Sequence, residues 1–142
     1  MKQPLIIDSG AAETVLPSTW FTEYPLKESE GQKQGRWYTT ADGSPIYNEG
    51  ERTLHVSNLE GTHERKMTFQ VADVNKALGS AAKIVNNGSR IVMDLDDQGN
   101  DYSYIESRKT GERLWMRQRN GVYVLDLLVG PPPKEGFTRP GK

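Results

Sequence analysis

Cysteine is absent from the sequence, and this absence excludes several kinds of chemistry. Without thiols the chain forms no disulfide bond, offers no thiolate nucleophile and builds no zinc–thiolate site. A chain without cysteine also suits a reducing compartment. At 142 residues it fits one domain, large enough to bury a modest apolar core.

Long apolar runs and an excess of one charge are lacking as well. No apolar stretch approaches the roughly 18 residues of a membrane span, and the N-terminal MKQPLIID is too short and too soon charged for a signal peptide. The 18 Lys and Arg residues nearly balance the 19 Asp and Glu residues. The basic residues between 108 and 119 are interspersed with Glu106 and Glu112, which predicts a solvated face. We therefore expect no membrane and no nucleic-acid partner.

Histidine is scarce, which limits the metal and nucleophile chemistry. His55 and His63 have no carboxylate or cysteine framework around them, so they predict no metal site and no Ser-His-Asp arrangement. The segment DLDDQG at 94–99 is superficially similar to a calcium loop. However, Gln98 stands at its fifth position and Ile105 at its twelfth, where a bidentate Glu is needed. We expect no metal and no cofactor.

Short apolar or alternating runs between turn residues dominate the chain and predict strands. The expected strands cover residues 3–8, 13–16, 36–40, 46–47, 52–59, 66–74, 89–95, 102–107, 113–117 and 122–129. Residues 18–35 are polar and broken by proline and glycine, so we expect a loop there. One helix is expected over 77–87, with Ser80 as a cap and a left-handed Gly88 at its end. The sum is an all-β domain with one short helix, as a closed or orthogonally packed barrel.

The stretch IIDSGAAETVL places Asp8 at the end of an apolar strand, directly before a turn. One interpretation is structural, because an Asp before Ser-Gly often caps the backbone N–H groups of its own turn. The other is functional. The small residues Gly10, Ala11 and Ala12 leave space around the carboxylate, and Gly10 lets a ligand approach the backbone closely. Two carboxylates held together cannot both ionise, so such a pair supplies an acid and a base at once.

The residues from Ile6 to Leu16 strongly resemble the active-site segment of retropepsins, the aspartic proteases of retroviruses and retrotransposons. The order of the other motifs is similar too. The segment from Trp37 to Tyr47, with the turn Ala41-Asp42-Gly43, takes the place of the flap hairpin. Ala77-Leu78-Gly79 resembles the apolar-apolar-Gly motif before the family's helix. The form DSGA, the segment GSAAKIV and the later RNGVYVLD are most similar to copia-type retrotransposon polyproteins. The resemblance covers residues 3–95 well and 96–129 loosely.

The resemblance implies a retropepsin-like closed barrel over 1–129, with a flap hairpin, followed by a Pro-rich tail or linker over 130–142. Only one Asp-[Ser/Thr]-Gly motif exists, so it also implies a homodimer in which Asp8 of each subunit meets at the two-fold axis. The implied catalytic segment is Asp8, Ser9 and Gly10. The implied substrate-binding residues are Ala11, Ala12, Glu13, Thr14, Val15, Ala41, Asp42, Gly43, Ala77 and Leu78.

Two departures from the family pattern occur together. Retroviral members often carry an acidic residue where Ala12 stands and an Arg where Ser80 stands, and those two residues pair. Because both are missing, neither leaves an unpaired charge. The strand expected over 123–129 is another candidate for dimer contacts, since terminal strands interleave at the family's interface. The hypothesis is an aspartic endopeptidase that processes a retroelement polyprotein in the cytoplasm, free or inside a virus-like particle. The alternative is an inactive module of the same fold that dimerises or binds peptides.

Overall fold

The computed structural model describes residues 1–35, 37–39 and 43–132. This part of the chain is mostly β-sheet, in agreement with the all-β prediction. The strands are β1 (Lys2–Asp8), β2 (Val15–Pro17), β3 (Trp37–Thr39), β4 (Pro45–Tyr47), β5 (Gly50–Ser57), β6 (Glu64–Ala72), β7 (Leu78–Ser80), β8 (Ser89–Val92), β9 (Ser103–Ser107), β10 (Arg113–Arg119) and β11 (Val122–Val129). The helices are α1 (Glu30–Lys33) and α2 (Ala81–Asn86).

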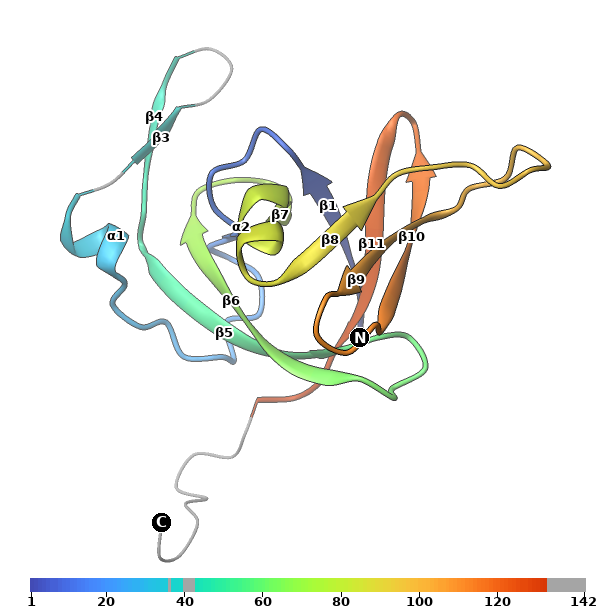
Figure 1. Cartoon of the computed structure of the whole chain (residues 1–142). Coiled ribbons are helices and arrows are strands. Elements are labelled where there is room, and N and C mark those ends of the chain that lie inside the picture. Colours follow the sequence, from blue (N-terminus) through green and yellow to red (C-terminus); the bar gives the residue numbers. More distant parts are fainter. Residues whose placement is uncertain (36, 40–42, 133–142) are drawn as a thin grey trace, which may run out of the picture.

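The main sheet has nine strands, hydrogen-bonded in the order β1-β7-β2-β6-β5-β11-β10-β9-β8. β1 also pairs with β11, so the pairings run in a circle from β1 through β7, β2, β6, β5 and β11 back to β1. β10, β9 and β8 continue from β11 as an antiparallel meander, and α2 lies in front of the circle of strands (Figure 1). β3 and β4 form a separate two-stranded ribbon.

The alternating strands supply the core, as the period-two pattern predicts. Along β5, buried and half-buried residues alternate over its whole length, and β6 buries Phe69 and Val71 on the same principle. These side chains meet those of β1 and β11. The shared core includes Leu5, Ile7, Leu16, Leu54, Val56, Phe69, Leu125 and Leu127.

Helix α2 has the two end signals that its sequence predicts. The Ser80 hydroxyl accepts a hydrogen bond from the backbone N–H of Lys83, and Gly88 has a φ of 101° just beyond the last turn. The helix is shorter than expected, however, because residues 78–80 form strand β7 between β1 and β2. The pairing of β7 with both neighbours overrides the helical tendency of the Ala-Leu-Gly-Ser-Ala-Ala run.

A second correction concerns residues 18–35, which were expected to form only a loop. They include the single turn α1, whose Ser29 side chain accepts from the N–H of Gln32 while the Gln32 side chain accepts from the N–H of Ser29. This reciprocal pair is a capping box, and its Ser-x-x-Gln signature stands in the sequence. The sequence predicted one helix, and this was wrong because α1 is a second, single-turn helix.

Strand β11 has hydrogen-bonded neighbours on both of its edges. One edge pairs with β1, from Leu128 opposite Lys2 to Tyr123 opposite Ile7. The other edge pairs with β10 near its beginning and with β5 at Leu128 and Val129. The tight turn before β11 has positive φ at Asn120 and Gly121, 51° and 82°, as Asn-Gly predicts.

No helix in the described ranges is long and apolar enough to cross a membrane.

Candidate active site

Asp8 is the last residue of β1 and lies between two other strands. In the parallel pairing of β1 with β7, Asp8 is opposite Ser80. On the other edge, the antiparallel pairing with β11 ends one residue earlier, at Ile7 opposite Tyr123. The side chain is half-buried, whereas Ser9 and Gly10 are exposed. The paired strands thus hold the backbone of Asp8 while its carboxylate stays accessible from one side.

The turn after Asp8 is closed by Asp8 itself. The backbone N–H of Gly10 donates a hydrogen bond of 2.8 Å to Asp8 Oδ1, and the N–H of Ala11 donates to the Asp8 carbonyl at 3.4 Å. The structural interpretation of this motif is therefore confirmed. The same bonds do not exclude the functional one, since Asp8 Oδ2 has no hydrogen-bond partner among the residues that the structure describes.

Gly10 keeps the carboxylate uncovered. A β-carbon added at position 10 would lie 3.4 Å from Asp8 Oδ1, with no other atom beyond its chain neighbours as close. Gly10 does not need its conformational freedom here, because its φ is not positive. The absent side chain is what matters: any larger residue would stand against the carboxylate oxygen.

The end of the Asp8 loop is fixed from inside. Thr14 is buried, and its Oγ1 accepts a hydrogen bond of 3.0 Å from the backbone N–H of Ser80. The Ser80 hydroxyl in turn donates to the carbonyl of Ala11 at 2.7 Å. Sequence analysis identified Ser80 only as a helix cap and as the position of a missing Arg. The available signal for its second role was a hydroxyl residue directly after Ala77-Leu78-Gly79.

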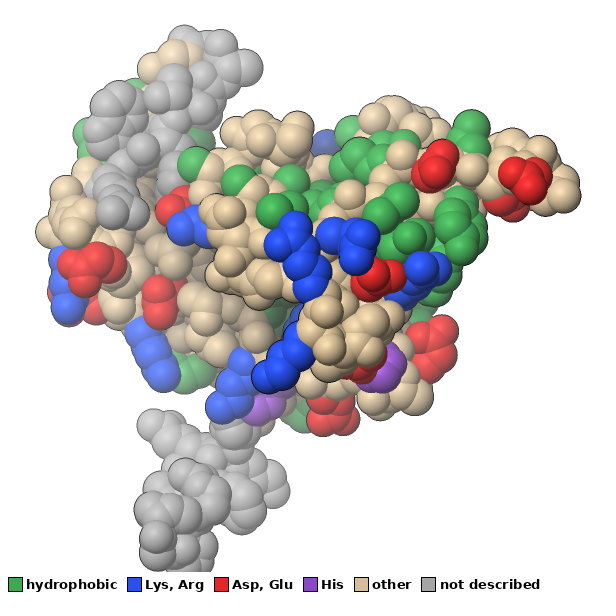
Figure 2. All heavy atoms as spheres, in the orientation of Figure 1, with side chains coloured by type: hydrophobic (Ala, Val, Ile, Leu, Met, Phe, Trp, Pro, Cys, Tyr) green, Lys and Arg blue, Asp and Glu red, His purple; other side chains and the backbone are tan. Residues whose placement is uncertain are grey.

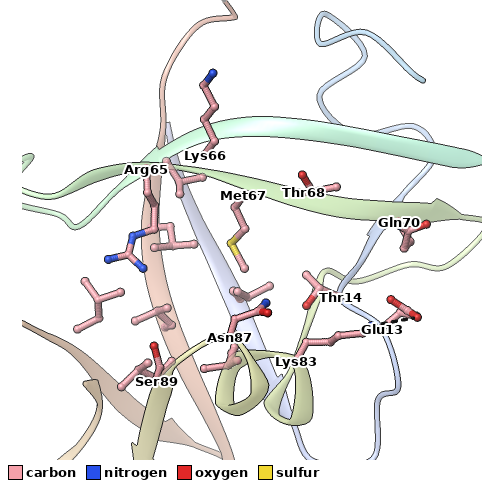
Figure 3. Close-up of a pocket in the computed structure, with 17 residues that line it drawn as sticks. Glu13, Thr14, Arg65, Lys66, Met67, Thr68, Gln70, Lys83, Asn87 and Ser89 are labelled. Atoms are coloured by element: carbon pink, nitrogen blue, oxygen red, sulfur yellow. Dashed lines mark ion pairs between the residues drawn. The ribbon is translucent and has the colours of Figure 1, made fainter. Parts of the chain in front are cut away.

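Glu13 and Lys83 form an ion pair of 3.7 Å at one end of a cavity of about 490 Å³ (Figure 3). The cavity lies between β6 and α2, and core side chains such as Leu5 and Leu125 line it. Glu13 and Thr14 belong to its lining, but Asp8 does not. Of the residues expected to bind substrate, these two therefore line a cavity to which Asp8 does not belong.

The other expected wall residues have different degrees of burial. Val15 and Ala77 are buried in the core of the single chain, and Leu78 is half-buried. Ala11 is half-buried, and Ala12 is exposed beside Asp8 in the loop. Ala11 and Ala12 thus lie in the loop that follows Asp8, whereas Leu78 is opposite Ile6 in the pairing of β7 with β1.

The two-stranded ribbon of β3 and β4 covers the residues for which a flap was expected. Tyr38 pairs with Ile46 in an antiparallel register, and the ribbon rises from the same end of the molecule as the Asp8 loop (Figure 1). Gly43, near its tip, is exposed with a φ of 88°. The predicted substrate-binding residues Ala41 and Asp42 lie outside the described residues.

Several charged groups away from Asp8 form ion pairs or cap turns in the described part of the chain. Lys and Arg side chains gather over the face of α2, β8 and β9, with acidic groups among them (Figure 2). Glu106 pairs with both Arg90 and Arg113, and Asp96 caps its own turn by accepting from the N–H groups of Gln98 and Asn100. No group of three His, Cys, Asp or Glu side chains in the described ranges could hold a metal ion.

Comparison of the chain with protein-family models, with curated proteins and with solved structures returned no match.

Proposed function

We propose that the chain is one half of a retropepsin-like aspartic endopeptidase, and that the circle of paired strands is its barrel. The observation that carries the proposal is the placement of Asp8. Its strand ends at the surface, its turn leaves one carboxylate oxygen without a partner, and Gly10 leaves that carboxylate uncovered. Strand β7, which contains Leu78 and Gly79 of the apolar-apolar-Gly motif, lies beside it between β1 and β2. This juxtaposition supports the resemblance noted in the sequence.

One Asp8 cannot supply both an acid and a base, so the proposed enzyme is a homodimer. In the dimer the two Asp8 carboxylates share one proton, since two carboxyl groups held close together cannot both ionise. The charged carboxylate takes a proton from a water molecule as the water oxygen attacks the peptide carbonyl carbon. The protonated carboxylate gives its proton to the carbonyl oxygen. The tetrahedral intermediate then breaks its C–N bond as the leaving nitrogen is protonated, with no covalent enzyme intermediate.

The substrate proposed for this site is an extended peptide, most simply a segment of the retroelement polyprotein. A peptide between the Asp8 loops and the two β3–β4 hairpins would bind by strand-like pairing. Closure of the hairpins would exclude water from the reacting bond. In the proposed dimer, the exposed Ser9 would hydrogen-bond with its copy across the two-fold axis.

The dimer must form without β11. Both edges of this strand are paired within the chain, so interleaving it with a second copy would break the bonds to β1 or to β10 and β5. We therefore propose that the subunits meet through the exposed Asp8 loop and the ends of the strands beside it. They do not exchange β11 strands. A small interface of this kind implies weaker association than an interleaved one.

The test compares wild type with Asp8→Asn in the cleavage of an unstructured peptide at acidic pH. Asp8→Asn is expected to abolish cleavage while leaving the circular dichroism spectrum unchanged, because only the charge of one side chain is removed. Asp97→Asn, in an exposed turn, is the matched control and should cleave like wild type. The proposal fails if wild type and Asp8→Asn are equally inert and pepstatin-type inhibitors do not bind. That result would favour the inactive peptide-binding module, in which Asp8 only caps its turn.

A further inference from the structure

Ser80 occupies the position directly beside Asp8. The two residues are opposite each other in the parallel pairing of β7 with β1, and Ser80 is fully buried, with 0% of its surface exposed. A buried serine needs partners for its hydroxyl, since an unsatisfied polar group in the interior is costly. The partners that Ser80 has all belong to the Asp8 loop or to the helix behind it.

Ser80 joins three segments of the chain through its polar atoms. Its N–H donates to Thr14 Oγ1 at 3.0 Å, at the end of the Asp8 loop. Its Oγ donates to the Ala11 carbonyl at 2.7 Å, near the middle of that loop. The same Oγ accepts from the N–H of Lys83 at 3.2 Å, in the first turn of α2. One residue thus ties the loop that follows Asp8 to the beginning of the helix.

These bonds determine how freely the loop can move. Ser9, Gly10 and Ala12 are exposed, so apolar packing contributes little to their order. The bond from Gly10 N–H to Asp8 Oδ1 closes the turn but is itself local and does not reach the buried part of the fold. The contacts of Ser80 to Ala11 and Thr14 connect that turn to the buried part of the fold.

We propose that Ser80 is a positioning residue of the Asp8 site. Its hydroxyl and N–H hold the loop of residues 9–14 so that the Asp8 carboxylate keeps one orientation toward substrate. The catalytic consequence rests on the proposed function. The effect acts through the loop, because Ser80 itself is buried and does not reach the reacting atoms. In a site where a misplacement of about 1 Å can cost 100-fold in rate, such a support is needed.

The connection between Ser80 and the Asp8 loop involves no charged group. Two neutral groups, a hydroxyl and a backbone carbonyl, make the tie, so no buried charge has to be balanced in the loop. Ala12, which follows Ala11 in the loop, accordingly needs no carboxylate. The loop is anchored through a hydrogen-bonding network that has no salt dependence, unlike an ion pair between exposed side chains.

The test is the pair Ser80→Ala and Ser103→Ala, read by peptide cleavage and by amide hydrogen exchange. Ser103 is the matched control, because it is a buried serine, 1% exposed, whose Oγ accepts from the N–H of Asp94 at 3.0 Å and donates to its carbonyl at 3.2 Å. It supports the β8–β9 turn, away from Asp8 in the sheet order. Both variants lose a buried hydroxyl and should lose similar stability.

Ser80→Ala is expected to lower kcat at least 10-fold with a smaller change in KM, and to speed amide exchange in residues 9–14. Ser103→Ala is expected to change neither quantity. Ser80→Thr, which keeps the hydroxyl, should recover part of the lost kcat. If Ser80→Ala does not fold, Thr14→Val removes only the acceptor of the Ser80 N–H and should give the same pattern in a weaker form.

The inference is overturned if the amides of residues 9–14 exchange at the wild-type rate in Ser80→Ala, or in Thr14→Val where that variant takes its place. It is also overturned if the cleaving enzyme keeps its kcat in that variant or if Ser103→Ala lowers kcat equally. Failure of the proposed function looks different. Wild type then does not cleave, yet exchange in residues 9–14 still rises in Ser80→Ala and not in Ser103→Ala, which supports the positioning of the loop by Ser80.

Discussion

Gly79 lies so close to Leu5 that a β-carbon at position 79 would push the Leu5 side chain aside by a few tenths of an ångström. A β-carbon placed on Gly79 would be 3.0 Å from Leu5 Cδ2 and 3.1 Å from Ile7 Cδ1. Both contacts are with core side chains of β1, the strand that ends in Asp8. The absence of a side chain at position 79 therefore lets β7 lie closely against these two side chains, in the pairing that sets Ser80 opposite Asp8.

Gly79→Ala is expected to destabilise the fold. The added methyl group must displace Leu5 or Ile7, and overpacking of this kind costs about 1–3 kcal/mol. Urea unfolding measures the loss. Gly130→Ala is the control, since its β-carbon would have no neighbour closer than the His55 carbonyl at 4.0 Å and its φ is not positive. Equal stability of wild type and Gly79→Ala would contradict the close packing of β7 on β1.

Gly10→Ala is expected to separate activity from stability. The new methyl group would touch Asp8 Oδ1 at 3.4 Å, in a loop that is otherwise open, and φ is compatible with alanine. We expect a urea midpoint close to that of wild type and a loss of cleavage of about 10-fold or more, because the group would stand against the carboxylate that the proposed mechanism uses. A fully active Gly10→Ala variant would show that this side of the carboxylate is not used.

Asp126 predicts a pH dependence of stability. Two hydrogen bonds from Arg117, of 2.7 and 3.1 Å, lower the pKa of the Asp126 carboxyl, and partial burial opposes them. A carboxyl whose pKa is lower in the folded state stabilises the fold above its unfolded pKa of about 3.9. This contribution is lost as the pH falls through the lower pKa of the folded state.

Asp126→Asn should therefore be less stable than wild type at pH 7, and the difference should shrink as the pH falls below about 4. The loss should be smaller than for Gly79→Ala, since Arg117 is partly exposed and water screens the pair. Urea midpoints of both proteins across this pH range measure it, with Asp97→Asn as an exposed control. A difference that is constant with pH would rule out the charge of Asp126 as its cause.

The pairing of β11 on both edges predicts that its amides are protected in the single chain. Hydrogen exchange of residues 123–128 should be slow and independent of protein concentration, because β1, β10 and β5 already supply their partners. Protection that appears only at high concentration would mean that β11 exchanges between subunits, as the family resemblance first implied. Residues 9–12 of the Asp8 loop are the internal comparison, and we expect their protection to rise when the dimer forms.

Local signals in the sequence predicted the elements that depend on local chemistry. The final strand was expected over 122–129 and is found there, and the Asn120-Gly121 turn before it has the expected positive φ values. Ser80 and Gly88 mark the ends of α2 as predicted. In each case the residue type and its neighbours in the chain decide the conformation.

The missed features depend on contacts far apart in the chain. Residues 78–80 fall within the expected helix but form β7, because Ile6 and Ile7 on one side and Val15 on the other supply strand partners. The role of Ser80 beside Asp8 follows from that same pairing, over 72 positions of sequence, and no local pattern contains it. The pairing of β1 with β11 joins the two ends of the domain and could not be predicted from either strand alone.

The distance between the two Asp8 carboxylates in a crystal of the dimer tests the central claim most directly. The proposed mechanism needs one proton shared between them, so the nearest oxygens of the two Asp8 side chains should lie about 3 Å apart across a two-fold axis. Ser80 Oγ should remain bonded to the Ala11 carbonyl in both subunits. An assembly that holds the two carboxylates beyond hydrogen-bonding distance, or a protein that remains a monomer at crystallisation concentrations, would contradict it.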